Sequence, residues 1–240
     1  MLILALDTTT RAGSLALARD GTPVAAEAGD ASRTHGERLP DEIAQLLSRQ
    51  RIALPAIDLF AVAAGPGSFT GLRIGIATMQ GLALAHGRGL VGISALDALA
   101  FGAREWLTAR GGEPAGALAI WMDAHRREVF AALYRASDLT PLDGPTVAPP
   151  GEVLVRWAPA LAGGPVWFTG DGALAYRQLI AGGAWPIVEP VPLVAPGVAA
   201  LAARQIAVRP APRPETIRPL YVRRPDAELA RDRAKARIPG

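Results

Sequence analysis

The sequence of 240 residues contains no cysteine and a single lysine. Without cysteine, a disulfide framework, a thiol nucleophile and a thiolate metal site are all excluded. The lysine is Lys235, close to the end of the chain. This position excludes a P-loop, whose lysine must reach the outer phosphates of a nucleotide. The three histidines, His35, His86 and His125, lie far apart in the sequence, so no histidine pair has the spacing of a metal site.

Long apolar runs are also missing. No run reaches the roughly 18–20 residues that a membrane span needs, because Arg, Asp, His or Gly interrupts each one. The first residues, MLILALDTTT, have no basic leader and soon reach Asp7, so we expect a strand there rather than an export signal. Half of the residues are hydrophobic and a fifth are charged, which is ordinary for a globular protein. We therefore expect a cytoplasmic protein with no membrane partner.

Charge is distributed unevenly along the chain. Residues 204–240 contain ten Lys or Arg and four Asp or Glu, a net charge of +6. The whole chain carries +3, so residues 1–203 carry −3. Two interpretations of this Pro/Arg-rich end are open: a partly disordered tail, which we favour, or an arm that approaches RNA phosphates.

Hydrophobic periodicity predicts an α/β protein with two lobes. Strand-like runs and amphipathic helices alternate as strand-strand-strand-helix-strand-helix, and a similar order recurs after residue 115. We expect a mixed sheet with crossover helices in each lobe. The glycine-containing segment 109–116 is the predicted boundary, which gives a first lobe at 1–108, a second lobe at 116–224 and a basic tail at 225–240.

The most distinctive segment, GPGSFTGLRIG, begins a helix expected at 70–86. A serine-hydrolase elbow requires G-x-S-x-G, but Pro66 and Thr70 stand where the two glycines should be. Ser68 is instead predicted to cap the helix. For the preceding helix, two starts are open: Thr34 with the capping-box partner Glu37, or a start near Pro40.

Two turns have the composition of anion-binding loops. They supply the candidates for weak nucleotide contacts, which are Asp7, Thr8, Thr9, Gly170 and Gly172. Both turns also have an ordinary turn composition, which we prefer as their explanation. At the start of the second lobe, where a matching phosphate loop would be expected, the bulky residues His125, Arg126 and Arg127 would crowd a nucleotide. We therefore expect no cofactor and no metal.

The helix at 70–86 is apolar on nearly all sides, since Arg73 and Gln80 are its only long polar side chains before His86. Such a helix is expected to be buried on more than one side. We predict that a second polypeptide covers one side, together with the preceding helix; the alternative is that the second lobe covers it. The side chains predicted for this partner interface are Leu39, Ile43, Leu46, Leu72, Ile76 and Met79.

Four segments together resemble the TsaB family: LALDTTTRAGSLAL, AAGPGSFTGLRIGIATMQGLA, DAHRREVFAALY and PLYVRR. The similarity extends to about Arg224, and its most specific part is the glycine loop, with Gly65, Gly67, Ser68, Thr70, Gly71 and Arg73. The resemblance implies an actin/sugar-kinase-like (ASKHA) fold. It also implies an accessory subunit that pairs with TsaD, or with itself when alone, helps recruit TsaE and meets tRNA through the complex.

The resemblance further implies that this chain is not the catalyst. The related catalytic subunit TsaD carries metal-binding histidines shortly after its glycine loop, whereas residues 92–100 here, GISALDALA, contain none. Gly36 and His125 depart from the family pattern and leave details of the second lobe open. The alternatives are an independent kinase-like ATPase, an M22-type peptidase, or a tRNA-binding module that depends on the residues after Leu220.

Overall fold

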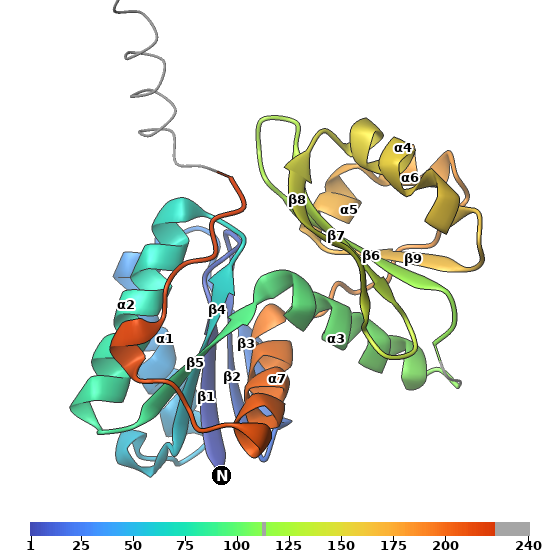
Figure 1. The fold of residues 1–240 in the computed structure, drawn as a ribbon. Coiled ribbons are helices and arrows are strands. Elements are labelled where there is room, and N and C mark those ends of the chain that lie inside the picture. Colours follow the sequence, from blue (N-terminus) through green and yellow to red (C-terminus); the bar gives the residue numbers. More distant parts are fainter. Residues whose placement is uncertain (112–113, 224–240) are drawn as a thin grey trace, which may run out of the picture.

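The chain forms two lobes, each built on a mixed β-sheet (Figure 1). The computed structural model describes residues 1–111 and 114–223. In the first sheet the strand order is β3-β2-β1-β4-β5; β1, β2 and β3 are antiparallel, whereas β4 and β5 run parallel to β1. Its strands are β1 (Leu2–Asp7), β2 (Ser14–Arg19), β3 (Thr22–Ala28), β4 (Leu59–Gly65) and β5 (Gly89–Ser94).

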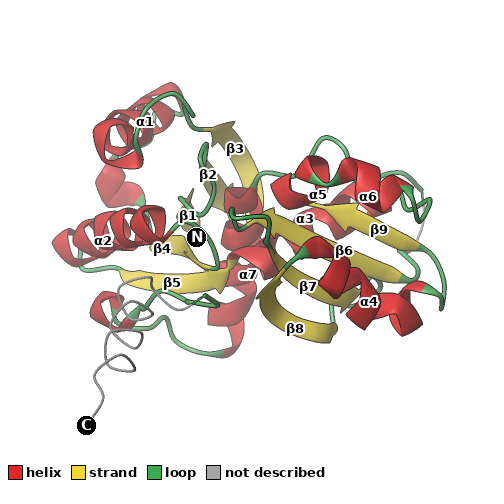
Figure 2. Ribbon diagram, turned by 90° about the horizontal axis from the view of Figure 1, so that it is seen from above, coloured by secondary structure: helices red, strands yellow, loops and turns green. Residues whose placement is uncertain are grey.

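Helices cover both faces of the first sheet, and the alternation of side chains along β1 explains why. Leu4 and Leu6 point to the layer formed by α1 (His35–Arg49) and α2 (Phe69–Ala85). Ile3 and Ala5 point to the opposite layer, formed by α3 (Ala95–Thr108) and α7 (Val194–Val208). All six β1 residues are buried, as expected of a strand covered on both faces. Figure 2 shows α1 and α2 outside, and α3 and α7 between the two sheets.

The second sheet has the order β8-β7-β6-β9. Its strands are β6 (Ala117–Asp123), β7 (Val129–Arg135), β8 (Pro141–Ala148) and β9 (Val166–Thr169). One face packs on α3, and the other is covered by α4 (Pro150–Leu161), α5 (Asp171–Ala175) and α6 (Arg177–Ala181). Strand β8 was not expected from the sequence, because the segment PLDGPTVA contains two prolines and a glycine, which are uncommon in strands.

The predicted second lobe at 116–224 is too long at its C-terminal end. After the second sheet the chain returns to the first lobe, where α7 packs against β1, β2 and α3. The following segment, residues 209–223, runs along α2, and we call it the strap (Figure 1). The second lobe is therefore an insertion between α3 and α7. The predicted tail at 225–240 lies outside the described residues.

The N-termini of α1 and α2 follow their capping residues. In α1, Thr34 and Glu37 form the capping box, so the helix starts at His35, and Pro40 lies inside it. In α2, the hydroxyl of Ser68 accepts a hydrogen bond from the backbone N–H of Gly71 at 3.2 Å, which confirms the predicted cap. None of the helices in the described part of the chain has the length and apolar character needed to cross a membrane.

Candidate functional site

A cavity of about 930 Å³ lies between the two lobes. We call it the interlobe cavity. Its wall combines the turn after β1, the start of α1, the glycine loop, the β6–β7 turn, the start of α5 and the end of the strap. Because these segments are far apart in the sequence, the fold is needed to bring them together.

The carboxylate of Asp7 is buried at the end of β1, beside this cavity. Its Oδ1 accepts hydrogen bonds from the backbone N–H of Thr9 at 2.8 Å and from the Thr9 hydroxyl at 2.6 Å. Burial raises the pKa of Asp7 to about 6, although the hydrogen bonds from Thr9 oppose this rise. Asp7 is therefore close to half-protonated at slightly acidic pH.

On the opposite side of the cavity, Asp171 occupies the first position of α5. Its Oδ1 accepts from the backbone N–H groups of Asp123 at 3.0 Å and of Gly172 at 2.9 Å. Burial raises the pKa of Asp171, and the nearby carboxylate of Asp123 adds to this effect. Within residues 1–111 and 114–223, no three His, Asp or Glu side chains gather closely enough to ligate a metal ion.

The glycines at the start of α2 allow β1 and its following turn to approach the helix. A Cβ at Gly67 would lie 2.6 Å from Thr9 Cα, and one at Gly75 would lie 2.1 Å from Thr8 Oγ1. Thr8 Oγ1 also donates to the carbonyl of Gly71 at 2.8 Å. Gly71 thus admits the backbone of Thr8 and Gly75 admits its side chain, whereas a Cβ at Gly81 would meet nothing within 4 Å.

Close packing likewise explains the glycines of the second turn. Gly170 has a φ of 106°, and a Cβ there would lie 2.1 Å from the carbonyl oxygen of Trp121. At Gly172, a Cβ would lie 2.8 Å from the carbonyl carbon of Met122. Of the five candidates for nucleotide contacts, Thr9 lines the interlobe cavity, and the other four do not.

The glycine loop itself forms one wall of the interlobe cavity. Gly67, Ser68, Thr70 and Gly71 line it, whereas Gly65 and Arg73 do not. Gly65 instead packs against the strap, because a Cβ there would lie 2.6 Å from the carbonyl oxygen of Leu220.

The strap closes one side of the cavity and was not identified as part of a site from the sequence. The backbone N–H of Leu220 donates to the carbonyl of Ala64 at 2.6 Å. The ring of Tyr221 stacks on that of Phe69, with centroids 5.1 Å apart. Arg73 lies 3.9 Å from the Phe69 centroid and donates to the Tyr221 hydroxyl at 3.1 Å. The only sequence feature that pointed to the strap was the PLYVRR segment, and it was used as part of a family resemblance and not as part of a site.

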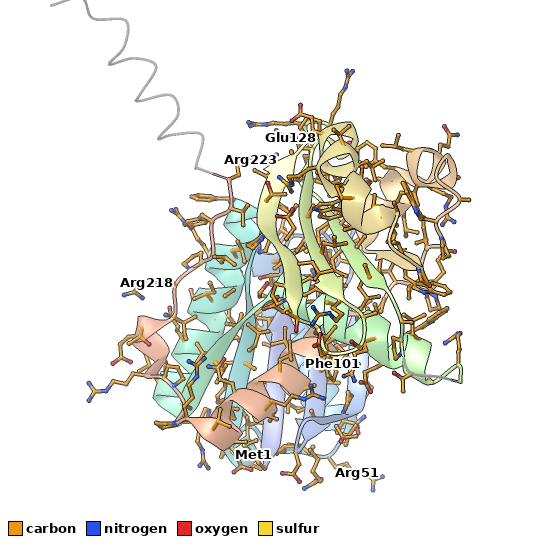
Figure 3. The ribbon with its side chains drawn as sticks, turned by 45° about the vertical axis from the view of Figure 1, so that its right-hand side comes forward. Met1, Arg51, Phe101, Glu128, Arg218 and Arg223 are labelled. Carbon is orange, nitrogen blue, oxygen red and sulfur yellow. The ribbon has the colours of Figure 1, made fainter. Side chains whose placement is uncertain are left out.

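Arg223, at the end of the strap, reaches the second lobe. Its guanidinium donates to the carbonyl of Ala124 at 2.7 Å and forms an ion pair with Glu128. Arg223 and Glu128 lie beside each other at the top of Figure 3. The strap therefore connects α2 of the first lobe to the β6–β7 turn of the second.

His35, which also lines the cavity, is held in a neutral state. Its Nε2 lies 3.0 Å from the carbonyl of Thr10, and its Nδ1 lies 2.7 Å from the guanidinium of Arg38. Burial and the charge of Arg38 lower the pKa of His35. Both ring nitrogens are engaged, so His35 is not placed to act as a general base for the Ser68 hydroxyl.

The side chains predicted for the partner interface are buried within the chain itself. Leu39, Ile43, Leu46, Leu72, Ile76 and Met79 are between 0% and 6% exposed. These side chains are therefore not available to a partner, and their assignment to an interface is corrected. The apolar stripe that they form packs α1 and α2 onto the first sheet. That these two helices meet a partner stays a prediction.

The opposite side of α2 is open over part of its length. Ala77, Gly81, Leu84 and Ala85 are exposed, and Leu84 keeps 57% of its surface accessible. The alternative prediction, that the second lobe covers this side of α2, is wrong for these four residues. The strap instead covers the part of α2 around Gln80, whose side chain donates to the carbonyls of Pro214 and Ile217. We call Ala77, Gly81, Leu84 and Ala85 the outer face of α2.

Comparison with known proteins gives both family and fold. Residues 29–231 match the family model described as TsaD, tRNA N6-adenosine threonylcarbamoyltransferase. The tRNA threonylcarbamoyladenosine biosynthesis protein TsaB of Escherichia coli is 40% identical over 138 residues, covering 58% of this chain and 57% of that protein. A Pseudomonas aeruginosa structure, described as an uncharacterized protein with similarity to the peptidase YeaZ, is 30% identical with a TM-score of 0.74, covering 92% of this chain and 99% of that one.

A more distant structure shares the fold alone. The activator of the 2-hydroxyisocaproyl-CoA dehydratase of Clostridium difficile aligns with a TM-score of 0.53 at 11% identity, over 87% of this chain and 96% of that one. The predicted two-lobed ASKHA fold with a mixed sheet in each lobe is confirmed.

Proposed function

The chain belongs to the TsaD family and is TsaB-like, and from this premise we propose that it takes part in tRNA threonylcarbamoyladenosine biosynthesis as a non-catalytic accessory subunit. In this proposal it pairs with TsaD, or with a second copy of itself when TsaD is absent. The pair holds TsaD in a state competent for transfer and provides a surface for TsaE. The tRNA is met by the assembled complex in the cytoplasm.

The outer face of α2 is the observation that carries this proposal. Its exposed side chains are apolar or small, while Ile76, Met79 and Ala83 on the opposite side pack in the core of the first sheet and Gln80 contacts the strap. The neighbouring α1 also has a buried inner stripe and an open outer side, but that side is mostly polar, with Asp41, Gln45 and Ser48 around the exposed Ala44. Small residues let a second backbone approach closely, and an open apolar helix face is typical of a protein interface.

A bulky charge on the outer face tests the pairing without disturbing the core. Gly81→Arg suits this purpose, because a side chain there points into open space. Ile76→Glu does not, since Ile76 is 4% exposed and the carboxylate would be buried in the core. We expect Gly81→Arg to abolish co-purification with TsaD of the same organism and to leave the unfolding temperature of the isolated chain nearly unchanged.

The matched control is Ala158→Arg, which adds the same charge at an exposed position of α4 in the second lobe. This variant should pair with TsaD as the parent chain does. If Gly81→Arg also pairs with undiminished affinity, the outer face of α2 is not the interface.

A second candidate function, an independent kinase-like ATPase, is favoured by one observation. The interlobe cavity is large enough for a nucleotide and lies beside Asp7 and Asp171, two carboxylates whose pKa values are raised. A calorimetric titration of the isolated chain with ATP and magnesium separates the two functions. Stoichiometric binding with turnover would favour the ATPase, whereas an accessory subunit should hydrolyse no ATP by itself.

A further inference from the structure

The edge strands of the two sheets differ in how they are protected. Within the described part of the chain, these strands are β3 and β5 in the first sheet, and β8 and β9 in the second (Figure 2). An uncovered edge strand presents backbone N–H and C=O groups to which another chain can hydrogen-bond. Proteins therefore usually cover such an edge, or interrupt it with proline, charge or a bulge.

Two of these edges are covered by the chain itself. The backbone N–H of Leu90 in β5 donates to the carbonyl of Pro212 in the strap at 3.5 Å. In β9, the N–H of Phe168 donates to the carbonyl of Pro186 at 2.9 Å, and its carbonyl accepts from the N–H of Val188 at 2.8 Å. The strap thus occupies the edge at β5, and the segment after α6 occupies the edge at β9.

Strand β8 is interrupted by its own sequence. It contains Pro141, Gly144 and Pro145, and its pairing with β7 has two register shifts. Proline has no N–H to donate to an added strand, and an irregular backbone does not match a regular one. Strand β8 is therefore protected against the addition of another strand.

Strand β3 has backbone groups that point away from its neighbour. The N–H of Gly29 donates to the carbonyl of Gly13 at 3.3 Å, and this bond shows which residues face β2. Because alternate residues of an antiparallel strand face the partner, the N–H and C=O groups of Ala26 and Ala28 point outward. Both residues are exposed, and no other described residue hydrogen-bonds to these outward groups.

The irregular part of β3 lies at its start. Pro23 and the register shift precede the run Ala25–Ala28, which pairs regularly with β2. Glu27 is the only charged residue of the strand, and it forms an ion pair with Arg49 of α1. No unpaired charge on this run would therefore repel an added strand. We call Ala25–Ala28 the open edge.

A groove of about 760 Å³ begins where β3 begins. Residues 20–23 form one of its walls, and α3 and α7 form the others. Its lining includes the apolar side chains of Phe101, Pro192 and Pro196. A strand edge beside an apolar groove is a recurring mode of peptide recognition, in which main-chain hydrogen bonds provide affinity and side-chain pockets provide specificity.

The charged groups of the groove indicate what its occupant carries. Asp20 is paired with the N-terminal amine at 2.7 Å, and the guanidinium of Arg204 lies 4.7 Å from the centroid of the Phe101 ring. Glu105 is exposed, and no ion pair joins its carboxylate to another described residue. A basic side chain next to an apolar one would therefore complement the groove.

We propose that the open edge and the groove together bind an extended segment of a partner protein. The segment pairs antiparallel with β3, which is the commoner and slightly more stable arrangement. This direction brings its C-terminal end to the groove, where an apolar side chain enters and a basic side chain meets Glu105. The site is separate from the outer face of α2 and does not rest on the proposed function.

The test uses the full-length chain and a fluorescein-labelled peptide, Thr-Val-Thr-Val-Thr-Leu-Arg amide. Fluorescence anisotropy measures binding, and NMR follows the hydrogen exchange of the Ala26 and Ala28 amides. We expect saturable binding that slows the exchange of both amides by about tenfold. Absence of saturation, or unchanged exchange of these amides at saturation, would overturn the proposal.

Methylated peptides test the main-chain hydrogen bonds without changing the protein. The nitrogens of the threonines are methylated in one peptide, and those of the valines in another. Because only alternate residues of an added strand face β3, one peptide should bind about tenfold more weakly and the other as the parent peptide does. Equal affinities of the two methylated peptides would contradict strand addition.

Ala26→Pro removes an outward N–H and leaves the ladder with β2 intact, since proline is tolerated where the N–H of an edge strand faces solvent. This variant should bind the peptide about tenfold more weakly at an unchanged unfolding temperature. Unchanged affinity would overturn the proposal. If the unfolding temperature falls, the methylated peptides decide.

Glu105→Gln tests the charged side of the groove. It should weaken binding of the parent peptide about threefold and leave binding of a peptide with glutamine in place of arginine unchanged. The matched control is Glu152→Gln, at an exposed position of α4 in the second lobe. An equal effect of both variants would show that Glu105 does not meet the arginine.

Self-association is the competing outcome. A concentration-dependent dimer of the unliganded chain that Ala26→Pro abolishes would identify a second copy as the occupant, and would overturn the assignment to a partner segment. Gly81→Arg should bind the peptide as the parent chain does. Loss of pairing with TsaD and loss of peptide binding can therefore be observed separately.

Discussion

Arg223 Nη1 and the carbonyl oxygen of Ala124 are 2.7 Å apart, and this hydrogen bond joins the strap to the second lobe. The same guanidinium pairs with Glu128 and lies 5.7 Å from the centroid of the Phe130 ring. The remainder of the strap is attached to α2 and to the end of β4. A contact between the strap and the β6–β7 turn thus spans the interlobe cavity, in addition to the core that both lobes share around α3.

Loss of this contact should loosen the two lobes. We expect Arg223→Ala to broaden the interlobe distance distribution and to lower the free energy of unfolding by about 1 kcal/mol, the usual value of a partly exposed hydrogen bond. The chain contains no cysteine, so Leu84→Cys in the first lobe and Val155→Cys in the second give two clean sites for spin labels, both at exposed side chains. Arg218→Ala is the control, because Arg218 donates to carbonyls of the strap itself. An unchanged distribution in Arg223→Ala would contradict the prediction.

Two glycines of α2 should respond to alanine in opposite directions. Gly75→Ala places a Cβ 2.1 Å from Thr8 Oγ1 and should lower the free energy of unfolding by about 2 kcal/mol, as overpacking does. Gly81→Ala meets nothing within 4 Å and should raise it by about 0.5–1 kcal/mol through helix propensity. Urea denaturation of both variants gives the comparison. Adding Thr8→Ala to Gly75→Ala should recover part of the loss, and strict additivity would show that the two residues do not touch.

Asp7 should make stability depend on pH. Its pKa is raised from 3.8 to about 6, so the folded state binds the proton more tightly than the unfolded state. The contribution of the protonated Asp7 to the free energy of unfolding is complete below pH 3.8, and it is lost as the pH rises through about 6. Asp7→Asn keeps an oxygen acceptor for Thr9 and removes the buried charge. We expect it to raise the free energy of unfolding by about 1–3 kcal/mol at pH 8 and to change it little near pH 4.

Urea denaturation at several pH values checks the Asp7 prediction. The parent chain and the variant should converge at acidic pH. A stability difference that is the same at pH 4 and pH 8 would show that the carboxylate of Asp7 is not the source.

Neutralising only one partner of the Arg38–Glu42 ion pair should lower the free energy of unfolding. Arg38 is 1% exposed, and its Nη1 lies 2.8 Å and 2.6 Å from the two carboxylate oxygens of Glu42. Glu42→Gln leaves the buried guanidinium without its counter-charge and should cost about 3 kcal/mol. Combining it with Arg38→Met should restore much of the stability, because the buried charge is then removed. A double variant as unstable as Glu42→Gln alone would contradict this explanation.

Much of the fold was predictable because local patterns and tertiary packing agree. Short apolar runs bounded by turn residues predicted β1 and β2, and helical spacing predicted α1 and α2. The capping residue Ser68 then set the start of α2 to within a residue, whereas for α1 a start at Thr34 and one near Pro40 were both open from the sequence. In each case the physical cause is local, and it operates within a few residues of the position that it determines.

Elements without a clear period were missed. Helix α7 is apolar on nearly all sides and contains Pro196 and Gly197, so no single face indicated its partner. Gly197 is needed because a Cβ there would lie 2.3 Å from the carbonyl oxygen of Ala98 in α3. A contact between helices nearly a hundred residues apart leaves no periodic signal in either segment.

The site was predictable in part. The glycine loop was recognised, and Gly67, Ser68, Thr70 and Gly71 do line the cavity. The stripe containing Leu72 and Ile76 was assigned to a partner interface but is buried within the chain, because burial by the chain's own sheet and burial by a partner give the same pattern of apolar residues. The strap was missed because its contribution depends on single contacts of Tyr221 and Arg223 with distant residues.

The return of α7 to the first sheet has a consequence for biosynthesis. When the ribosome has completed β5 and α3, five strands exist, but the face that α7 will cover is still open to water, and about eighty-five further residues must be translated before that helix appears. During this interval the nascent chain exposes Ile3, Ala5 and Ala16, which makes it a candidate for chaperone binding. The inserted lobe can fold first, so the lobe whose synthesis begins earliest is the last to be completed.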